Sequence, residues 1–159
     1  MNTKVRLWIA ALLVLGFARP ALAQPRDIVD TAVGAGSFKT LAKLLTDADL
    51  INVMKGPGPY TVFAPTDEAF AKVPKGVLDA LAKDKAKLQE VLKYHVLTSK
   101  WTSADLRSVP QTGTAQGKAL KFASSGGAVT VNDAKVIKAD IDCTNGMVHV
   151  IDTVLLPPQ

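Results

Sequence analysis

The spacing of the apolar residues changes near Pro110, and this change limits the possible folds more than any other feature of the chain. In residues 37–51, apolar side chains recur three or four positions apart, which predicts a helix with one buried face. After Pro110 the period falls to about two, as in residues 128–131 (AVTV), and turn residues interrupt it roughly every ten positions. A helical part followed by a strand-rich part predicts an α+β fold.

The same patterns place the individual elements. Helices are expected at residues 27–33, 37–51, 76–82 and 84–96, with Ser37 as the N-cap of the second. A short buried strand is expected at residues 60–64, and further strands at 119–123, 128–131, 135–139 and 147–151. Turns at 124–127, 132–133 and 145–146 join the last four strands, and Asn145-Gly146 is the strongest hairpin signal among them.

The N-terminus has the features of a secretory signal peptide. Lys4 and Arg6 precede an apolar run at residues 7–17, and the small residues at 21–23 suit a cleavage site. The run is shorter than the ~20 residues of a membrane-spanning helix. We therefore expect residues 1–23 to be removed, leaving a single domain of residues 24–159 that is secreted or periplasmic and has no stable membrane insertion.

Removal of the signal changes the charge of the protein. The whole chain carries 19 Lys and Arg against 14 Asp and Glu, a net charge of +5. Without Lys4, Arg6 and Arg19, 16 basic residues remain and the net charge falls to +2. We expect no nucleic-acid partner, because such binding depends on a marked excess of Lys and Arg.

Adjacent carboxylates follow the first predicted strand in GPGPYTVFAPTDEAF, residues 56–70. Pro65 cannot donate within a β-ladder and Thr66 has the side chain of a helix N-cap, so the two acids should occupy the first turn of a helix. Negative charge in that turn is stabilised by the helix dipole. General acid–base catalysis would need two carboxylates that face one cleft, whereas neighbours on a helix point about 100° apart. We interpret Asp67 and Glu68 as a helix start.

Few residues could support catalysis or metal binding. Cys143 is the only cysteine, so no internal disulfide can form, and its apolar neighbours favour a small buried side chain over a reactive thiol. Motifs for phosphate loops, serine hydrolases and zinc proteases are absent from the sequence. His95 and His149 lie among apolar residues, as core histidines do, although with Asp152 they could in principle hold a metal. No catalytic residue, metal or cofactor is expected.

Three segments, in this order and at these separations, resemble the fasciclin domain: TVFAPTDEAF at residues 61–70, YHVL at 94–97 and NGMVHVIDTVLLP at 145–157. The resemblance covers essentially residues 26–157. It implies an α+β fold in which a β wedge packs against a group of helices. It also implies an extracellular adhesion or interaction module without catalytic activity.

The resemblance also points to partner-binding residues. In the family the Tyr-His pair, here Tyr94 and His95, is linked both to core integrity and to integrin-dependent adhesion. Some animal members bind integrins through Pro-Asp-Ile ahead of the Asn-Gly turn, where this chain has Ala139, Asp140 and Ile141, so the last two are candidates for contact with some partner. The residues allow another interpretation, in which Tyr94 and His95 pack where the two halves meet and Asp140 is the solvent-facing position of a half-buried strand.

The resulting prediction is a monomeric module that contacts a cell-surface or matrix macromolecule, either protein or polysaccharide. An alternative from another class is recognition of a polysaccharide or cell-wall polymer, for which an exposed Trp101 would be the anchor. A third is a hydrolase with a site around His149 and Asp152, which requires both side chains to open into one cleft.

Overall fold

The computed structural model describes residues 26–158, so the predicted signal peptide at residues 1–23 lies outside the described residues. Seven helices and seven strands form in this part of the chain. The helices are α1 (Ile28–Ala35), α2 (Lys39–Asp47), α3 (Ile51–Lys55), α4 (Asp67–Ala71), α5 (Lys75–Lys83), α6 (Lys85–Tyr94) and α7 (Ser103–Ser108). The strands are β1 (Tyr60–Pro65), β2 (Val96–Leu97), β3 (Gln111–Gly113), β4 (Ala119–Ser125), β5 (Ala128–Val131), β6 (Ala134–Cys143) and β7 (Gly146–Ile151).

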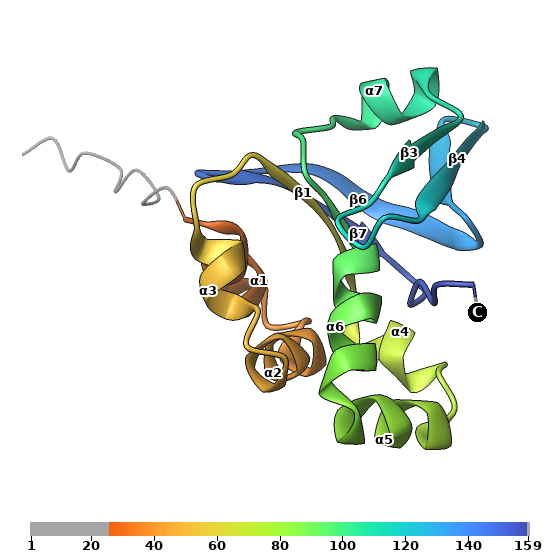
Figure 1. Ribbon diagram of the computed structural model, residues 1–159. Coiled ribbons are helices and arrows are strands. Elements are labelled where there is room, and N and C mark those ends of the chain that lie inside the picture. The colour runs from red at the N-terminus through yellow and green to blue at the C-terminus, as the bar shows by residue number, and fades with distance from the viewer. Residues whose placement is uncertain (1–25, 159) are drawn as a thin grey trace, which may run out of the picture.

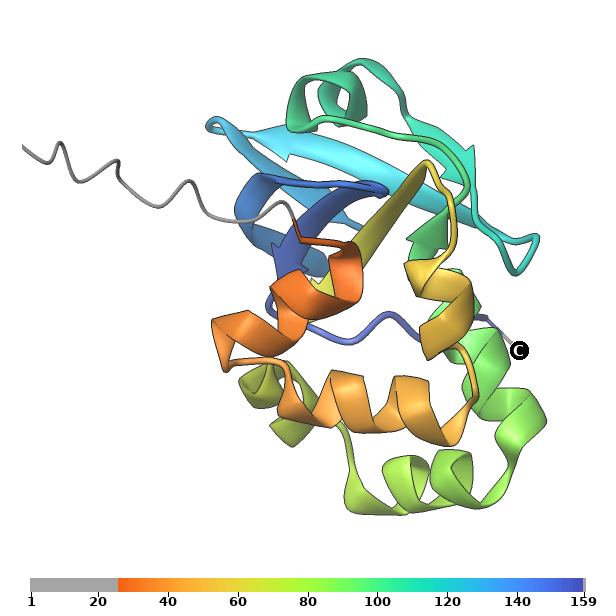
Figure 2. The same ribbon diagram turned by 90° about the vertical axis from the view of Figure 1, so that its left-hand side faces the viewer.

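All seven strands form one mixed sheet in the order β2-β1-β7-β6-β5-β4-β3. Only β1 and β7 run parallel, and every other pair is antiparallel. Helices α1 to α6 gather below the sheet, while α7 lies on its far side, away from α2 and α5 (Figure 1 and Figure 2). The α+β class and the β wedge packed against helices are therefore confirmed.

Two apolar cores lie on opposite faces of β1 and β7. Side chains alternate along a strand, so Val62 and Ala64 belong to the core shared with the helices, whereas Phe63 belongs to the core beneath α7. The first core also takes residues from helices α1 to α4 and α6, among them Ile28, Leu41, Leu45, Met54, Phe70, Leu88 and Leu92, and the N-cap residue Phe38 of α2. The second is built from Tyr94, Leu97, Leu106, Leu120, Phe122, Val129, Val131 and Ile151.

The helix start at Asp67 is confirmed, and its carboxylate has a second role. The Thr66 hydroxyl accepts a hydrogen bond from the Ala69 amide at 3.2 Å, as an N-cap does. The Oδ1 atom of Asp67 also accepts from the Thr40 amide of α2 at 2.8 Å. The prediction of Ser37 as the N-cap of α2 is wrong, because the cap position is Phe38 and the free amide is satisfied by this acid from another helix.

Other boundaries also differ from the prediction. The helix expected at 37–51 is divided into α2 and α3, because Asp49 adopts a left-handed conformation with φ of 57° between them. The hairpin between β6 and β7 is present, but Cys143 pairs with Gly146, so its turn residues are Thr144 and Asn145. Strands β2 and β3 and helix α7 were not expected from the sequence pattern.

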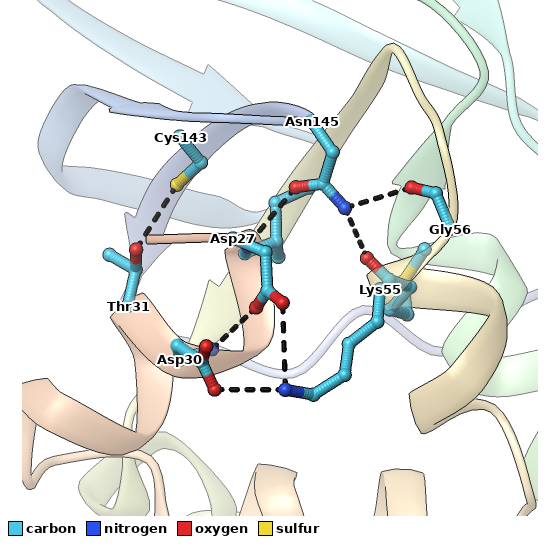
Figure 3. Close-up of polar contacts among 9 residues, drawn as sticks. Asp27, Asp30, Thr31, Lys55, Gly56, Cys143 and Asn145 are labelled. Carbon is cyan, nitrogen blue, oxygen red and sulfur yellow. Dashed lines mark hydrogen bonds and ion pairs between the residues drawn. The ribbon is translucent and has the colours of Figure 1, made fainter. Parts of the chain in front are cut away.

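Asn145 joins this hairpin to the N-terminal helices, as Figure 3 shows. Its Oδ1 atom accepts from the Ile28 amide at 3.1 Å, and its Nδ2 donates to the carbonyls of Met54 at 2.5 Å and Gly56 at 3.1 Å. The Asn145 carbonyl accepts from the Tyr60 amide at 3.0 Å. One side chain therefore fixes the start of α1 and the end of α3 against the sheet.

Close backbone packing at the same turn gives a test of this arrangement. A Cβ atom added at Gly146 would overlap the backbone of Tyr60, so Gly146→Ala should lower the free energy of unfolding by about 3 kcal/mol. The control is Gly76→Ala in α5, where an added Cβ meets nothing within 4 Å and should raise stability by about 0.5–1 kcal/mol. Urea unfolding of both variants measures the difference, and a loss of equal size in the two would contradict the packing described here.

Candidate functional site

His95 lies at the end of α6, with only 3% of its surface exposed. Its Nδ1 contacts the Val91 carbonyl at 2.7 Å, and its Nε2 accepts from the Leu155 amide at 2.9 Å. A carbonyl can only accept and an amide can only donate, so both contacts fix the neutral ring with its proton on Nδ1. Burial lowers the pKa of His95 from 6.5 to about 4. The imidazole therefore ties the C-terminal segment to α6.

Tyr94, which is 2% exposed, makes the equivalent link to the strand-rich half. Its hydroxyl donates to the Ala119 carbonyl at 3.3 Å and accepts from Nδ2 of Asn132 at 3.0 Å. Asn132 in turn accepts from the Lys121 amide at 2.9 Å through Oδ1. The Tyr-His pair thus lies where the two halves meet, as the packing interpretation predicts, and neither side chain is available for direct contact with a partner in this conformation.

His149 on β7 is fully buried and also neutral, with the opposite tautomer. Its Nε2 contacts the Trp101 carbonyl at 2.8 Å, and its Nδ1 accepts from the Asp140 amide at 3.2 Å. The ring stacks on Phe63 with 5.6 Å between ring centroids. Burial lowers the pKa of His149, so the ring stays uncharged near neutral pH.

The hydrolase hypothesis required His149 and Asp152 to open into one cleft, and this requirement is not met. Both ring nitrogens of His149 are occupied by backbone groups inside the fold. Asp152 accepts from the Lys135 amide at 2.9 Å and from the Thr153 hydroxyl at 3.1 Å. The two side chains therefore serve separate contacts within the fold.

Asp140 is exposed, but it is not simply a solvent-facing strand position. Its Oδ1 accepts from the Ser103 amide at 2.7 Å and its Oδ2 from the Ser103 hydroxyl at 2.6 Å. The hydrogen bond from that hydroxyl holds the pKa of Asp140 below its ordinary value. Asp140 thus supports the first turn of α7, a contact that sequence reasoning missed. The capping box of Thr102 and Asp105 was the local signal that could have identified this helix.

Trp101 lies just before α7 and is half-buried against the second core. Its amide donates to the Thr61 hydroxyl at 2.8 Å, and that hydroxyl donates to the Ser99 carbonyl at 2.6 Å. Because its carbonyl also accepts from His149, both main-chain polar groups of Trp101 are held by the sheet. The fully exposed ring that polysaccharide binding was expected to use is not present at this position.

The strand β6 departs from regular pairing beside Asp140. Two register shifts interrupt its ladder with β7, one between Val136 and Lys138 and one between Lys138 and Ile141. Asp140 has a φ of 58°, in the left-handed region that a non-glycine residue seldom adopts. Bulges of this kind redirect side chains and end strand pairing. The backbone of β6 therefore leaves the regular ladder at Asp140, one of the candidate partner-binding residues.

We define the β6 bulge surface as residues 137–142 together with Lys100. Ile137 is 54% exposed, so an apolar side chain faces solvent from this strand. Ile141 is half-buried and packs against the first core, so it supports the surface more than it extends from it. Lys100 pairs with Asp142 at 2.6 Å. The surface thus combines one apolar side chain with charges of both signs.

Cys143 is half-buried and free of any disulfide. Its thiol contacts the Thr31 hydroxyl at 3.4 Å, which links the end of β6 to α1 (Figure 3). Burial raises the pKa of the Cys143 thiol. A protonated thiol is a poor nucleophile, so the position behaves as the small packing residue that the sequence indicated, with part of its surface accessible.

Comparison with known proteins identifies the family. The Fasciclin domain model matches residues 36–157. The chain is 44% identical over 134 residues to protein sll1483 of Synechocystis, covering 83% of this chain and 74% of that protein. It is 36% identical over 116 residues to cell surface glycolipoprotein MPB83 of Mycobacterium bovis, covering 73% of this chain and 51% of that protein.

Longer relatives and a solved structure agree with this match. Human periostin is 33% identical over 133 residues, which cover 83% of this chain but 16% of periostin. The domain pair from the insect cell adhesion molecule fasciclin I has a TM-score of 0.63 and 22% identity, covering 77% of this chain and 46% of that chain. At this identity the structural likeness shows the fold alone.

The buried imidazole of His95 predicts acid sensitivity. The folded state has the lower pKa, so the unfolded state binds more protons between pH 6.5 and about 4. The contribution of His95 to the free energy of unfolding is therefore fully present above pH 6.5. It should be lost as the pH falls from 6.5 to about 4, by about 3 kcal/mol in total. Urea unfolding measured at pH 7, 6 and 5 tests this, because ordinary carboxylates lose most of their contribution only below about pH 5.

The control is His95→Gln, whose amide can donate and accept but does not titrate. This variant should be less stable at pH 7 but should lose less stability between pH 7 and pH 5 than the unmodified protein. The same pH dependence in both proteins would show that His95 is not its source.

The contact between Asp140 and Ser103 predicts a graded loss of stability. Asp140→Ala removes both acceptors from the start of α7 and places alanine at a left-handed φ, so it should cost about 1–2 kcal/mol. Asp140→Asn keeps one carbonyl acceptor and tolerates this backbone conformation, so it should cost about half as much. Thermal unfolding followed by circular dichroism compares them, and equal losses would argue against the capping role.

Proposed function

The chain belongs to the fasciclin domain family, and on this premise we propose that it is a non-catalytic interaction module that works outside the cytoplasm by contact with a macromolecule. The proposal places its contact site at the β6 bulge surface. It also takes the predicted removal of residues 1–23 as the step that releases the domain into the periplasm or the medium.

The names of similar proteins support an exposed location. MPB83 is described as a cell surface glycolipoprotein, and fasciclin I as a cell adhesion molecule. Within residues 26–158, no helix reaches the length and apolar character that crossing a bilayer requires. The descriptions of these two relatives support a domain that meets its partner outside the cell or in the periplasm.

The fixed conformation of Asp140 is the observation that carries the proposed contact site. A left-handed non-glycine residue costs energy and persists where surrounding contacts hold it in place. Here the contacts come from the ring of His149 behind the strand and from Ser103 beside it. The exposed Ile137 side chain lies three residues away on the same bulged strand. A rigid surface with an apolar centre can bind a partner without loss of loop entropy.

A protein partner suits this surface better than a polysaccharide. Sugar-binding sites need an exposed aromatic face, and the half-buried Trp101 provides it only in part. Ile137 and the Lys100–Asp142 pair instead resemble the apolar centre and charged rim of a protein interface.

Capture from cell fractions tests the contact site. The exported protein, immobilised through a C-terminal tag, is incubated with envelope, cell-wall and culture-medium fractions, and retained proteins are identified by mass spectrometry. Ile137→Asp should abolish retention of a specific partner, because it places a charge at the apolar centre while leaving the core untouched. The double variant Asp140→Ala, Ile141→Ala should have the same effect if circular dichroism shows that it is folded.

Val33→Asp is the matched control, since Val33 is 58% exposed and lies on α1, outside the β6 bulge surface. It should retain the partner as the unmodified protein does. Equal retention by all variants would eliminate the β6 bulge surface as the contact site. Failure of the unmodified protein to retain any macromolecule from any fraction would count against the interaction module itself.

A further inference from the structure

An apolar pocket of about 110 Å³ lies at the β2 edge of the sheet, among α2, α3, α6 and β1. Its walls include the buried side chains of Leu45, Leu50, Met54, Leu92 and Val96. Apolar cavities of about 150 Å³ in protein interiors bind molecules as large as benzene. The pocket is therefore large enough for part of an apolar ligand.

The rim of the pocket differs from its walls. Val53 on α3 is 52% exposed, and Ala115 is an exposed residue of the loop between β3 and β4. Tyr60 and Lys93 complete the lining. Within residues 26–158, Lys93 takes part in no ion pair. An apolar interior lined in part by the exposed lysine Lys93 and the half-buried Tyr60 suits a ligand with an apolar body and an anionic end.

A second, smaller apolar space adjoins the pocket. Leu45 and Met54 also line a second apolar space, of about 10 Å³, on the side of α1 and β7. These two side chains therefore form the partition between the spaces. Methionine is unbranched and adapts its conformation easily, so a movement of Met54 would lengthen the pocket without a change in the backbone.

We propose that this pocket binds the alkyl chain of an unbranched carboxylic acid, with the carboxylate at the rim beside Lys93 and Tyr60. The chain buries its methylene groups among Leu50, Leu92 and Val96, which provides the affinity. The ammonium group of Lys93 and the hydroxyl of Tyr60 stabilise the carboxylate, which fixes the direction of entry.

This binding is independent of the proposed contact with a macromolecule. The pocket lies at β2, one edge of the sheet, whereas β6 lies beyond β1 and β7 in the strand order. None of its lining residues belongs to the β6 bulge surface. Failure of one proposal therefore leaves the other unaffected.

Calorimetric titration of the exported protein with butanoate, hexanoate, octanoate and decanoate, each below its micellar concentration, tests the pocket. Each added methylene should tighten binding by up to about fourfold while it enters the pocket. The gain should stop when the pocket is full. Affinity that is independent of chain length, or that rises without a limit, would overturn the proposal.

Two surface variants separate the pocket from other sites. Ala115→Phe and Val53→Phe place a large ring at the rim without changing a buried wall, and each should weaken octanoate binding at least about tenfold by obstructing entry. Thermal unfolding verifies that the variants are folded. Octanoate binding that persists in both folded variants would show that the acid binds elsewhere.

Lys93→Met tests the carboxylate contact. It should weaken octanoate about fivefold and leave the neutral octan-1-ol unchanged. Lys43→Met, an exposed lysine of α2 that does not line the pocket, is the control and should change neither ligand. If both lysine variants weakened octanoate binding equally, the cause would be the net charge of the protein. That result would contradict the placement of the carboxylate beside Lys93.

A flotation assay distinguishes a free acid from the chain of a membrane lipid. With phosphatidylglycerol vesicles the protein should stay in solution, because a lipid chain is already buried in the bilayer. Flotation with vesicles, combined with no calorimetric response to octanoate, would identify membrane adsorption and overturn the proposal.

Discussion

The parallel pairing of β1 with β7 is the constraint on which the rest of the structure depends. It joins a strand from the helical half to the last strand of the chain, and these two strands separate the two cores. Val62 faces the helices beside its partner Val148, while Phe63 faces the opposite core beside His149. A shift of one residue would exchange the faces and place the imidazole among the helices. The register therefore determines both cores together.

Two buried histidines strengthen the connection between the two halves. Each ring bridges backbone groups that have no partner within the β1–β7 ladder. His95 reaches Leu155 beyond the end of β7, and His149 reaches Trp101 and the bulge of β6. An imidazole can donate at one edge and accept at the other, which suits a bridge between a carbonyl and an amide. The cost is sensitivity to acid, since protonation removes the acceptor and charges a buried ring.

Local signals in the sequence predicted the elements that depend on local chemistry. Pro65 and Thr66 marked the strand end and helix start correctly, and the change of period near Pro110 gave the α+β class. The role of Asp67 as a cap for α2 could not be predicted, because its partner Thr40 lies 27 residues away and on another helix. The contact between Asp140 and Ser103 could not be predicted either. Its two residues are 37 positions apart, and it depends on a bulge that no residue pattern indicated.

The buried polar groups of this domain serve contacts within its own fold. Within residues 26–158, no buried side-chain nitrogen or oxygen atom lacks a hydrogen-bond partner. These buried groups bind one another, whereas the contacts proposed above use two exposed places, the side chain of Ile137 and the lysine Lys93. Binding at either of these exposed residues would leave the β1–β7 pairing between the two cores unchanged.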